Sequence, residues 1–394
     1  MRCVGTVVRG IRTPIIKEHD DLATIVVDSL MEAQKNEGFE FHDKDIVAVT
    51  EAVVGISEGN YVTVDDIAKD MELRFPSKDI GVVFPILSRN RFSMILKGIA
   101  RGMDHITMQL SFPADEVGNG ILDEDLLDKS VYNLSSVISE EQYKETFGTW
   151  IHPFTGINMV DFYRELAESE HCKIDFVFSN DVKTILNYTN DVLSCDIHTR
   201  LHTKELLTKC GAHVYGLYEI MSCPVGDSGF NPYYGLLGSN KSTEERLKLF
   251  PKTGDKLVLD IQNKLKEKTG KTIEVMVYGD GAFKDPVGHI WELADPVVSP
   301  AFTSGLEGTP NEIKLKYVSD NKFADLRGDE LKEAIKEEIR NKAKDLKGTM
   351  VTQGTTPRRL TDLIGSLCDL TSGSGDKGTP VVFIQGYFDN LSND

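Results

Sequence analysis

The chain has 394 residues, of which 40% are hydrophobic and 27% are charged, and its formal net charge is −18. This composition is typical of a globular protein with a full core and enough length for two or three domains. The acidic excess argues against a general nucleic-acid or anionic-membrane binder, and six cysteines are too few for a disulfide scaffold. No apolar run approaches the ~18 residues of a membrane span and no signal-peptide segment is evident, so we expect a cytoplasmic protein.

Helical and strand patterns alternate along the chain, which predicts the α/β class with mixed α+β character. In the first third we expect strands over residues 4–8, 45–49, 81–84 and 105–110, and helices over residues 20–38, 63–75 and from 92 onward. In the middle we expect strands over residues 174–178, 214–220 and 272–278, and helices over 160–167, 203–209, 243–250 and 254–268. The pattern in the last part of the sequence predicts a charged helix over residues 329–346, an amphipathic helix over 357–370 and a buried strand over 381–384.

A glycine-serine loop joins the last predicted helix to the last predicted strand, and it reads Ser372-Gly373-Ser374-Gly375-Asp376-Lys377-Gly378. Glycines let successive backbone N–H groups converge on an anion, and a lysine adds a positive charge. The G-x-x-x-x-G-K-[ST] spacing of a Walker A loop is absent. The pattern predicts either a phosphate-binding segment or an ordinary polar connector.

Positive charge gathers at two other places. The stretch from Arg12 to Lys17 is a basic loop in an acidic chain, and Arg89 and Arg91 come just before a predicted helix. Cations are disfavoured at a helix N-terminus, so a bound anion would explain the two arginines, and plain exposure to solvent is the alternative.

Carboxylates follow two predicted strands. Asp115, Glu116 and Asn119 come after the strand at 105–110, and Asp280 stands between glycines after the strand at 272–278. Oxygen ligands at strand ends suit Mg²⁺ or Mn²⁺, although the same residue types make ordinary turns.

Cysteine and histidine are concentrated between residues 171 and 223, which hold four of the nine histidines and four of the six cysteines. The pairs Cys195-x-x-His198 and Cys210-x-x-His213 have the spacing of zinc-ligand steps. A structural zinc site is one hypothesis, and packing of these side chains in core and surface is the simpler one.

Several segments together resemble the coenzyme F420-0:γ-glutamyl ligase family. Residues 10–22, GIRTPIIKEHDDL, are close to that family's opening G-L-P-L-I-K-E-G-D-D-L, and residues 45–59 are similar to its D-V-L-V-V strand and S-K-A-E-G segment. Asp115 with Asn119 resembles its D-x-S-N element, and Asp280 stands where the family has the Asp of I-T-D-T. The stretch from Gly373 to Val382 is similar to its G-E-G-x-D-G-I-P-A-V-V ending.

The resemblance implies a dimeric enzyme that uses GTP and a divalent metal, Mg²⁺ or Mn²⁺, to activate a carboxylate as an acyl phosphate. The amine of L-glutamate then displaces the phosphate. The metal ligands would be Asp115 and Asp280, and no catalytic base stands out. The nucleotide contacts would come from Arg12, Thr13, Pro14, Ile15, Lys17, Asn119, Ser372, Gly373, Ser374, Gly375, Asp376 and Lys377.

The matching segments predict a ligase-like domain in two parts, residues 1–130 and 271–394, around an inserted α/β subdomain at 131–270. Some motif positions differ: Ile56 and Ser57 stand in the S-K-A-E-G segment without its lysine, and serines stand where the ending has an acidic residue. Two alternatives stay open. One is a nucleotide-binding protein of the same fold that has lost ligase activity, and the other is a ligase for a different carboxylated acceptor, such as a folate.

Overall fold

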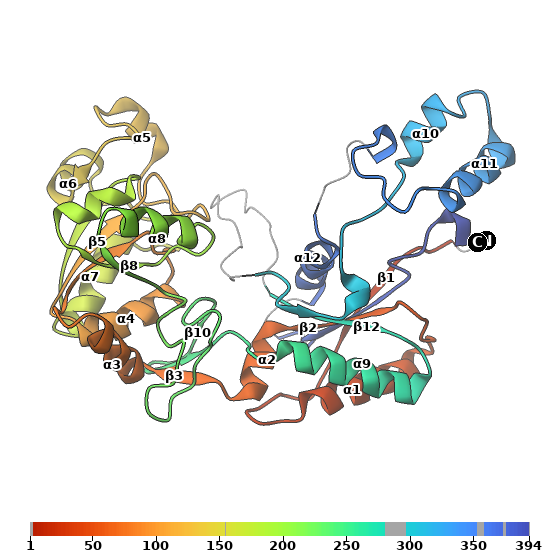
Figure 1. Cartoon of the computed structure of the whole chain (residues 1–394), viewed down its shortest axis with the longest axis horizontal. Helices are drawn as coiled ribbons and strands as arrows, with labels where there is room; N and C mark the ends of the chain where they lie inside the picture. The colour runs from red at the N-terminus through yellow and green to blue at the C-terminus, as the bar shows by residue number, and fades with distance from the viewer. Residues whose placement is uncertain (1–2, 154, 280–296, 353–357, 373–375, 394) are drawn as a thin grey trace.

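The structure, a computed structural model, describes residues 3–153, 155–279, 297–352, 358–372 and 376–393. Its described residues form mixed α/β layers with three sheets, of five, three and six strands. The two larger sheets lie in separate lobes, and the three-stranded sheet lies between them (Figure 1). The α/β class predicted from the alternating pattern is confirmed.

The five-stranded sheet combines strands from both ends of the chain. Its order is β1 (Val7–Ile11), β14 (Val381–Gln385), β2 (Ile46–Thr50), β12 (Glu274–Tyr278) and β13 (Ala301–Phe302). Helices α1 (Leu22–Glu37) and α9 (Gly254–Thr269) pack together on one face, and α12 (Leu360–Ser372) covers the other (Figure 1). Strand residues alternate between the two faces, so that Val47 and Val49 join the α1–α9 core while Ile46 and Ala48 join the α12 core.

The six-stranded sheet has five parallel strands and one antiparallel edge strand. Its order is β6 (Ile138–Ser139), β7 (Lys173–Phe178), β5 (His105–Leu110), β4 (Asp79–Val83), β8 (Asp191–Ser194) and β9 (His213–Gly216). The helices of this lobe are α3 (Val64–Arg74), α4 (Phe92–Gly102), α5 (Glu124–Lys129), α6 (Glu140–Phe147), α7 (Met159–Ser169), η1 (Val182–Asn187) and α8 (Arg200–Lys209).

The three-stranded sheet corrects the helix predicted over residues 243–250. That stretch forms β11 (Arg246–Lys248), which pairs with β10 (Asn240–Thr243) and with β3 (Tyr61–Thr63). Leu247 lies opposite Val62 and is fully buried, so cross-strand pairing outweighs the local helical pattern. We call β10 and β11 together the hairpin.

The sheets divide the chain at other places than the predicted boundaries at 130 and 270. Strands β4 and β5, from the predicted first part, pair with β7 and β8 in the six-stranded sheet. Helix α9, from the predicted insertion, packs on α1 beside the five-stranded sheet. The chain passes between lobes after α2 (Glu51–Glu58) and again between β11 and α9.

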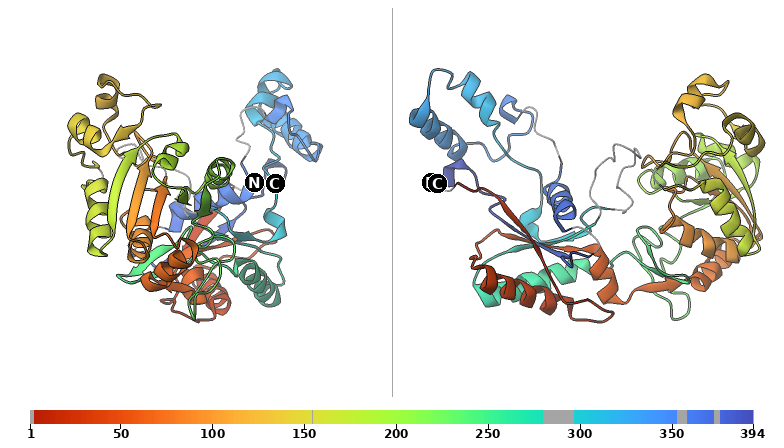
Figure 2. Two further views of the ribbon diagram at one scale, coloured as in Figure 1. Left: turned by 60° about the vertical axis from the view of Figure 1, so that its left-hand side comes forward. Right: turned by 180° about the vertical axis from the view of Figure 1, so that it is seen from behind.

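The C-terminal part adds short helices at one end of the five-stranded lobe (Figure 2). They are α10 (Leu315–Asn321), α11 (Gly328–Arg340), η3 (Met350–Thr352) and η4 (Leu391–Asn393), whereas η2 (Ser304–Leu306) lies against β12. Helix α1 is capped by Asp21, whose side chain accepts from the Thr24 N–H, so the helix begins at Leu22, two residues after the predicted start at 20. No helix in the described part of the chain is both long and apolar enough to cross a membrane.

Helices α3 and α4 cross so closely that glycine is required at the contact. A Cβ atom added to Gly102 would lie 2.6 Å from the backbone oxygen of Ala68, which cannot move without disturbing α3. We therefore expect Gly102→Ala to lower the free energy of unfolding by about 1–3 kcal/mol in urea denaturation. Gly5→Ala is the control, because an added Cβ there meets nothing within 4 Å. Equal stability of the two variants would contradict the prediction.

Candidate functional site

One edge of the five-stranded sheet gathers the predicted site segments. Strand β14 is antiparallel to both β1 and β2, and β12 is parallel to β2. Val381, the first residue of β14, pairs with Ile11 and Val49, while Tyr278 pairs with Thr50. The carboxyl ends of β1, β2 and β12 therefore meet the start of β14 at one edge, which we call the strand-end edge.

Backbone contacts join the opening loop to the loop before β14. The Thr13 N–H donates to the Gly378 oxygen at 3.3 Å, and the Thr50 N–H donates to the Pro380 oxygen at 3.0 Å. A Cβ atom on Gly10 would lie 3.1 Å from the Thr379 Cβ, so the loops are in close contact. Segments from opposite ends of the sequence thus lie side by side.

The residues of the predicted glycine-serine loop differ in where the structure places them. Ser372 is buried and is the last residue of α12, so the helix runs beyond its predicted end at 370. Asp376 and Lys377 are exposed. Gly373, Ser374, Gly375 and the predicted metal ligand Asp280 lie outside the described residues.

The two predicted cations of the opening loop, Arg12 and Lys17, line different pockets. Arg12 lines a pocket of about 620 Å³ along α1, together with Glu32 and Glu37. Lys17 lines a separate pocket of about 730 Å³. Pro14 and Ile15 are exposed between them.

The second pocket, which we call the junction pocket, lies where the opening loop, α2 and the three-stranded sheet meet. Its volume is within the range of small-molecule sites. Its lining residues are Lys17, Glu18, Ala52, Ile56, Tyr61, Asn240, Lys241, Ser242 and Lys248. The walls therefore combine lysines, an aromatic ring and a small apolar surface of α2.

A buried ion pair forms part of the junction pocket. The Lys248 Nζ lies 3.0 Å from an Oε of Glu51 and 3.5 Å from the Ala52 oxygen. Lys248 is 6% exposed and Glu51 is 5% exposed. Glu51 follows β2 directly as the first residue of α2, so the pair links the hairpin to the strand-end edge. Sequence reasoning missed Lys248, although Leu247 and Leu249 alternate with charged residues at the spacing of a strand.

A second charged group stands at the rim of the junction pocket. Arg246 lies over the Tyr61 ring, 3.8 Å from its centroid, and forms an ion pair with Glu18 at 2.8 Å. Burial and the neighbouring Glu18 raise the pKa of Tyr61, so the phenol stays neutral at physiological pH. The arrangement offers a flat ring edge and hydrogen-bonding groups to a ligand.

Asp115 holds its own loop together. One carboxylate oxygen accepts from the backbone N–H groups of Val117 and Asn119 at 3.0 and 2.8 Å. The other accepts from the Leu87 N–H at 2.8 Å and from the Asn119 side-chain amide at 2.7 Å. Although the residue as a whole is only partly buried, its carboxylate is removed from water, which raises its pKa to about 6.

These contacts bear on the predicted metal site. Both oxygens of Asp115 are already occupied by N–H donors, and Glu116 accepts from the backbone N–H groups of Ile197 and His198. Within residues 3–279 and the other described ranges, no group of three His, Cys, Asp or Glu side chains could hold a metal ion. The second predicted ligand, Asp280, lies outside the described residues, so a metal held by Asp115 and Asp280 stays a prediction.

The comparison with known families agrees with the order of these segments. The sequence model of the family described as F420-0:Gamma-glutamyl ligase matches residues 10–386, nearly the whole chain. The chain belongs to this γ-glutamyl ligase family. No curated protein matches the chain at a significant level. The family match spans both lobes, so the six-stranded lobe and the hairpin lie inside the matched region.

The cysteine and histidine pairs of this family member are spread over core and surface. Cys172 and Cys195 are buried, whereas Cys210 and Cys223 are exposed. His213 contacts Asp191 through Nδ1 at 2.8 Å. All eight cysteine and histidine residues lie in the described part of the chain, where no zinc-ligand group forms.

Arg89, the other predicted anion contact, is exposed in the loop before α4.

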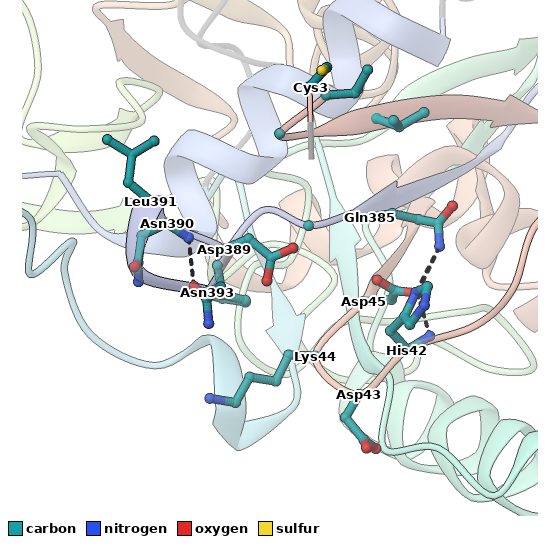
Figure 3. A pocket seen from close by; sticks show the side chains of 15 residues that line it. Cys3, His42, Asp43, Lys44, Asp45, Gln385, Asp389, Asn390, Leu391 and Asn393 are labelled. Atoms are coloured by element: carbon teal, nitrogen blue, oxygen red, sulfur yellow. Dashed lines mark hydrogen bonds and ion pairs between the residues drawn. The ribbon is translucent and has the colours of Figure 1, made fainter. Parts of the chain in front are cut away.

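A further pocket lies at the end of the five-stranded sheet opposite the strand-end edge (Figure 3). It has a volume of about 870 Å³ and is lined by residues before β1, before β2 and after β14. Asp45 is buried there and accepts from the side-chain amide of Gln385 at 3.1 Å. The lining has three aspartates, Asp43, Asp45 and Asp389, against Lys44 and His42, so it does not suit a phosphate.

Proposed function

We propose that this family member is a GTP-dependent γ-glutamyl ligase that activates a carboxylated acceptor and joins it to the amine of L-glutamate. The observation that carries the proposal is the meeting of the family's separated segments at the strand-end edge. Thr13 and Gly378 are joined there by a backbone hydrogen bond although they are far apart in sequence. Ligands of open α/β sheets commonly bind beyond the carboxyl ends of strands.

The reaction needs alignment and charge neutralisation more than a protein nucleophile. An acceptor carboxylate oxygen attacks the γ-phosphorus of GTP, the bond to the β-phosphate oxygen breaks, and GDP leaves. The glutamate nitrogen, having lost a proton to become a neutral amine, then attacks the acyl carbon. The C–N bond forms, the nitrogen loses a second proton, and the C–O bond to phosphate breaks.

The chain offers groups for binding the phosphates on both sides of the opening loop. Lys17 and Lys248 line the junction pocket, and the exposed Lys377 precedes β14. Lysine ammonium groups suit the charge that spreads over a transferring phosphoryl group. Mg²⁺ or Mn²⁺ would accompany GTP and neutralise part of its phosphate charge, with Asp115 and Asp280 as the proposed ligands.

The test is a mass-spectrometric assay of glutamate addition. The purified chain is offered L-glutamate with GTP or ATP and a panel of acceptors that contains F420-0, folates and other carboxylates. We expect one acceptor to gain the mass of a glutamyl residue only when nucleotide is present. No product with any acceptor, together with GTP binding by calorimetry, would replace the proposal with a nucleotide-binding protein of this fold.

The occupied Asp115 carboxylate is the observation that favours this second candidate. Titration of GTP with and without Mn²⁺ into wild type, Asp115→Ala and Asp280→Ala separates the two functions. A ligase requires nucleotide binding that depends on metal, whereas metal-independent binding that survives both substitutions supports the altered protein. We also propose a homodimer, which light scattering of the purified chain tests directly.

A further inference from the structure

We propose that the Lys248 ammonium binds an anionic group of a substrate in the junction pocket, either a nucleotide phosphate or the acceptor carboxylate. The proposal rests on the proposed function only for the identity of these two substrates. Lys248 comes from the hairpin, which joins the site through pairing with β3. It is distinct from the cations Arg12, Lys17 and Lys377 that the sequence pattern indicates.

Stability alone does not explain a buried ion pair at this place. Moving two charges out of water costs about as much free energy as their mutual attraction contributes. Replacing such a pair with apolar residues is therefore often neutral or stabilising for the fold. The face of α2 beside Lys248 would tolerate such a replacement, since the lysine stem lies against Gly55, and Ala52 and Ile56 line the same pocket. An ammonium kept beside a pocket is therefore better explained by a ligand that requires it.

The geometry leaves Lys248 able to donate into the pocket. An ammonium group has three N–H donors. Within the described part of the chain its contacts are Glu51 and the more distant Ala52 oxygen, and Lys248 also lines the junction pocket. Glu51 thus orients the ammonium, and a remaining donor is available for a ligand oxygen.

Close packing fixes the position of this side chain. A Cβ atom on Gly55 would lie 3.1 Å from the Lys248 Cδ and 3.0 Å from the Leu249 oxygen, so glycine lets the hairpin lie directly against α2. The lysine stem is therefore held on the helix surface. A positioned ammonium loses little conformational entropy when it binds an anion.

The surroundings suit an anion attached to a planar group. Lys17 adds positive charge to the lining, whereas Lys241 is paired with Glu244 and the lining carboxylate Glu18 is paired with Arg246. Tyr61 provides an aromatic surface, and Ile56 and Ala52 provide apolar contact. Lys248 is itself paired with Glu51, so the lining has a small excess of positive charge in a chain with a net charge of −18.

The experiment measures binding to variants of the full chain. Lys248→Met is combined with Glu51→Gln so that no charge is left buried and unpaired, and Lys248→Arg tests whether charge restores binding. Lys336→Met is the matched control, because Lys336 is 8% exposed and pairs with Glu333 at 3.1 Å far along the chain on α11. The probes are GTP with Mn²⁺ and folic acid as a planar carboxylate, and both are titrated calorimetrically. Circular dichroism melting verifies that each variant is folded.

We expect the double variant to weaken at least one probe about tenfold or more, as the loss of a charged hydrogen bond implies. Lys248→Arg should retain most of the binding, and Lys336→Met should bind like wild type. Loss confined to GTP assigns the anion to the nucleotide, and loss confined to folic acid assigns it to the acceptor. Wild-type affinity of the folded double variant for both probes, or failure of both probes to bind wild type, would overturn the inference.

The outcome is separable from that of the proposed function. If wild type ligates glutamate while the double variant binds both probes normally, the ligase stands and the role of Lys248 fails. If binding depends on Lys248 but no acceptor gains glutamate, the anion site stands and the ligase fails.

Discussion

Replacing Glu51 with alanine is expected to lower the free energy of unfolding by about 3–5 kcal/mol, because the Lys248 ammonium would be left buried without its carboxylate. The two groups lie 3.0 Å apart, and both side chains are less than 10% exposed. The change is measured by urea denaturation at neutral pH, with the midpoint and slope compared with wild type.

A double-mutant cycle provides the control for this prediction. Lys248→Met alone removes the ammonium that faces the buried Glu51 carboxylate, and it should also destabilise the protein. The double variant Glu51→Ala with Lys248→Met removes both charges and should recover a large part of the loss. If the losses of unfolding free energy in the two single variants simply add in the double variant, the two side chains are not coupled and the prediction is wrong.

The second large effect is a pH dependence centred on Asp115. Its pKa is raised from 3.8 to about 6 by removal from water, so the native state binds a proton more tightly than the unfolded chain does. The stability contributed by this group is therefore fully present below about pH 3.8 and is lost as the pH rises through about 6. Relative to the non-titrating Asp115→Asn variant, wild type should lose about 3 kcal/mol between these limits.

Urea denaturation of both proteins across the range from about pH 3.5 to 7 gives the difference curve, in which the other titrating groups cancel. Asp21→Asn serves as a control of opposite sign. Hydrogen bonds from Thr24 lower the pKa of Asp21, so its contribution is present above pH 3.8 and is lost as the pH falls. A difference curve for Asp115→Asn that is flat, or that rises with pH, would refute the assignment.

Local patterns were sufficient for much of the five-stranded lobe. The strand predicted at 381–384, the helix predicted at 254–268 and the strand predicted at 272–278 correspond to β14, α9 and β12, because each has a strong apolar period and clear end signals. The family segments were recognisable for the same reason, since each is short and contiguous. Their meeting at one edge depends on strand order, which no local pattern specifies.

The hairpin shows what local patterns miss. Residues 243–250 contain Glu, Arg, Leu and Lys, which all favour helices, so a helix was predicted there. The strand forms because Leu247 finds Val62 across the sheet, a contact between residues that are far apart in the chain. Missing the hairpin also meant missing Lys248, and the site inferred from motifs therefore lacked its buried ammonium.

Asp115 illustrates a different limit. A carboxylate followed by glycine and asparagine at a strand end is typical of both a cation site and a turn, and the residue types alone do not separate the two. The separation comes from the directions of four N–H donors, one of which belongs to Leu87 in another loop. Such convergence is a property of the folded chain.

The position of β14 bears on how the protein is made. This strand is nearly the last segment of the chain, yet it lies inside the five-stranded sheet between β1 and β2. During synthesis, β1 and β2 leave the ribosome more than 300 residues before β14, the strand that pairs with both of them. The six-stranded lobe is encoded without interruption and can fold first, as contiguous domains generally do. We therefore expect nascent chains truncated before β14 to contain a protease-resistant six-stranded lobe and an unfinished strand-end edge, which forms only once β14 has joined the sheet.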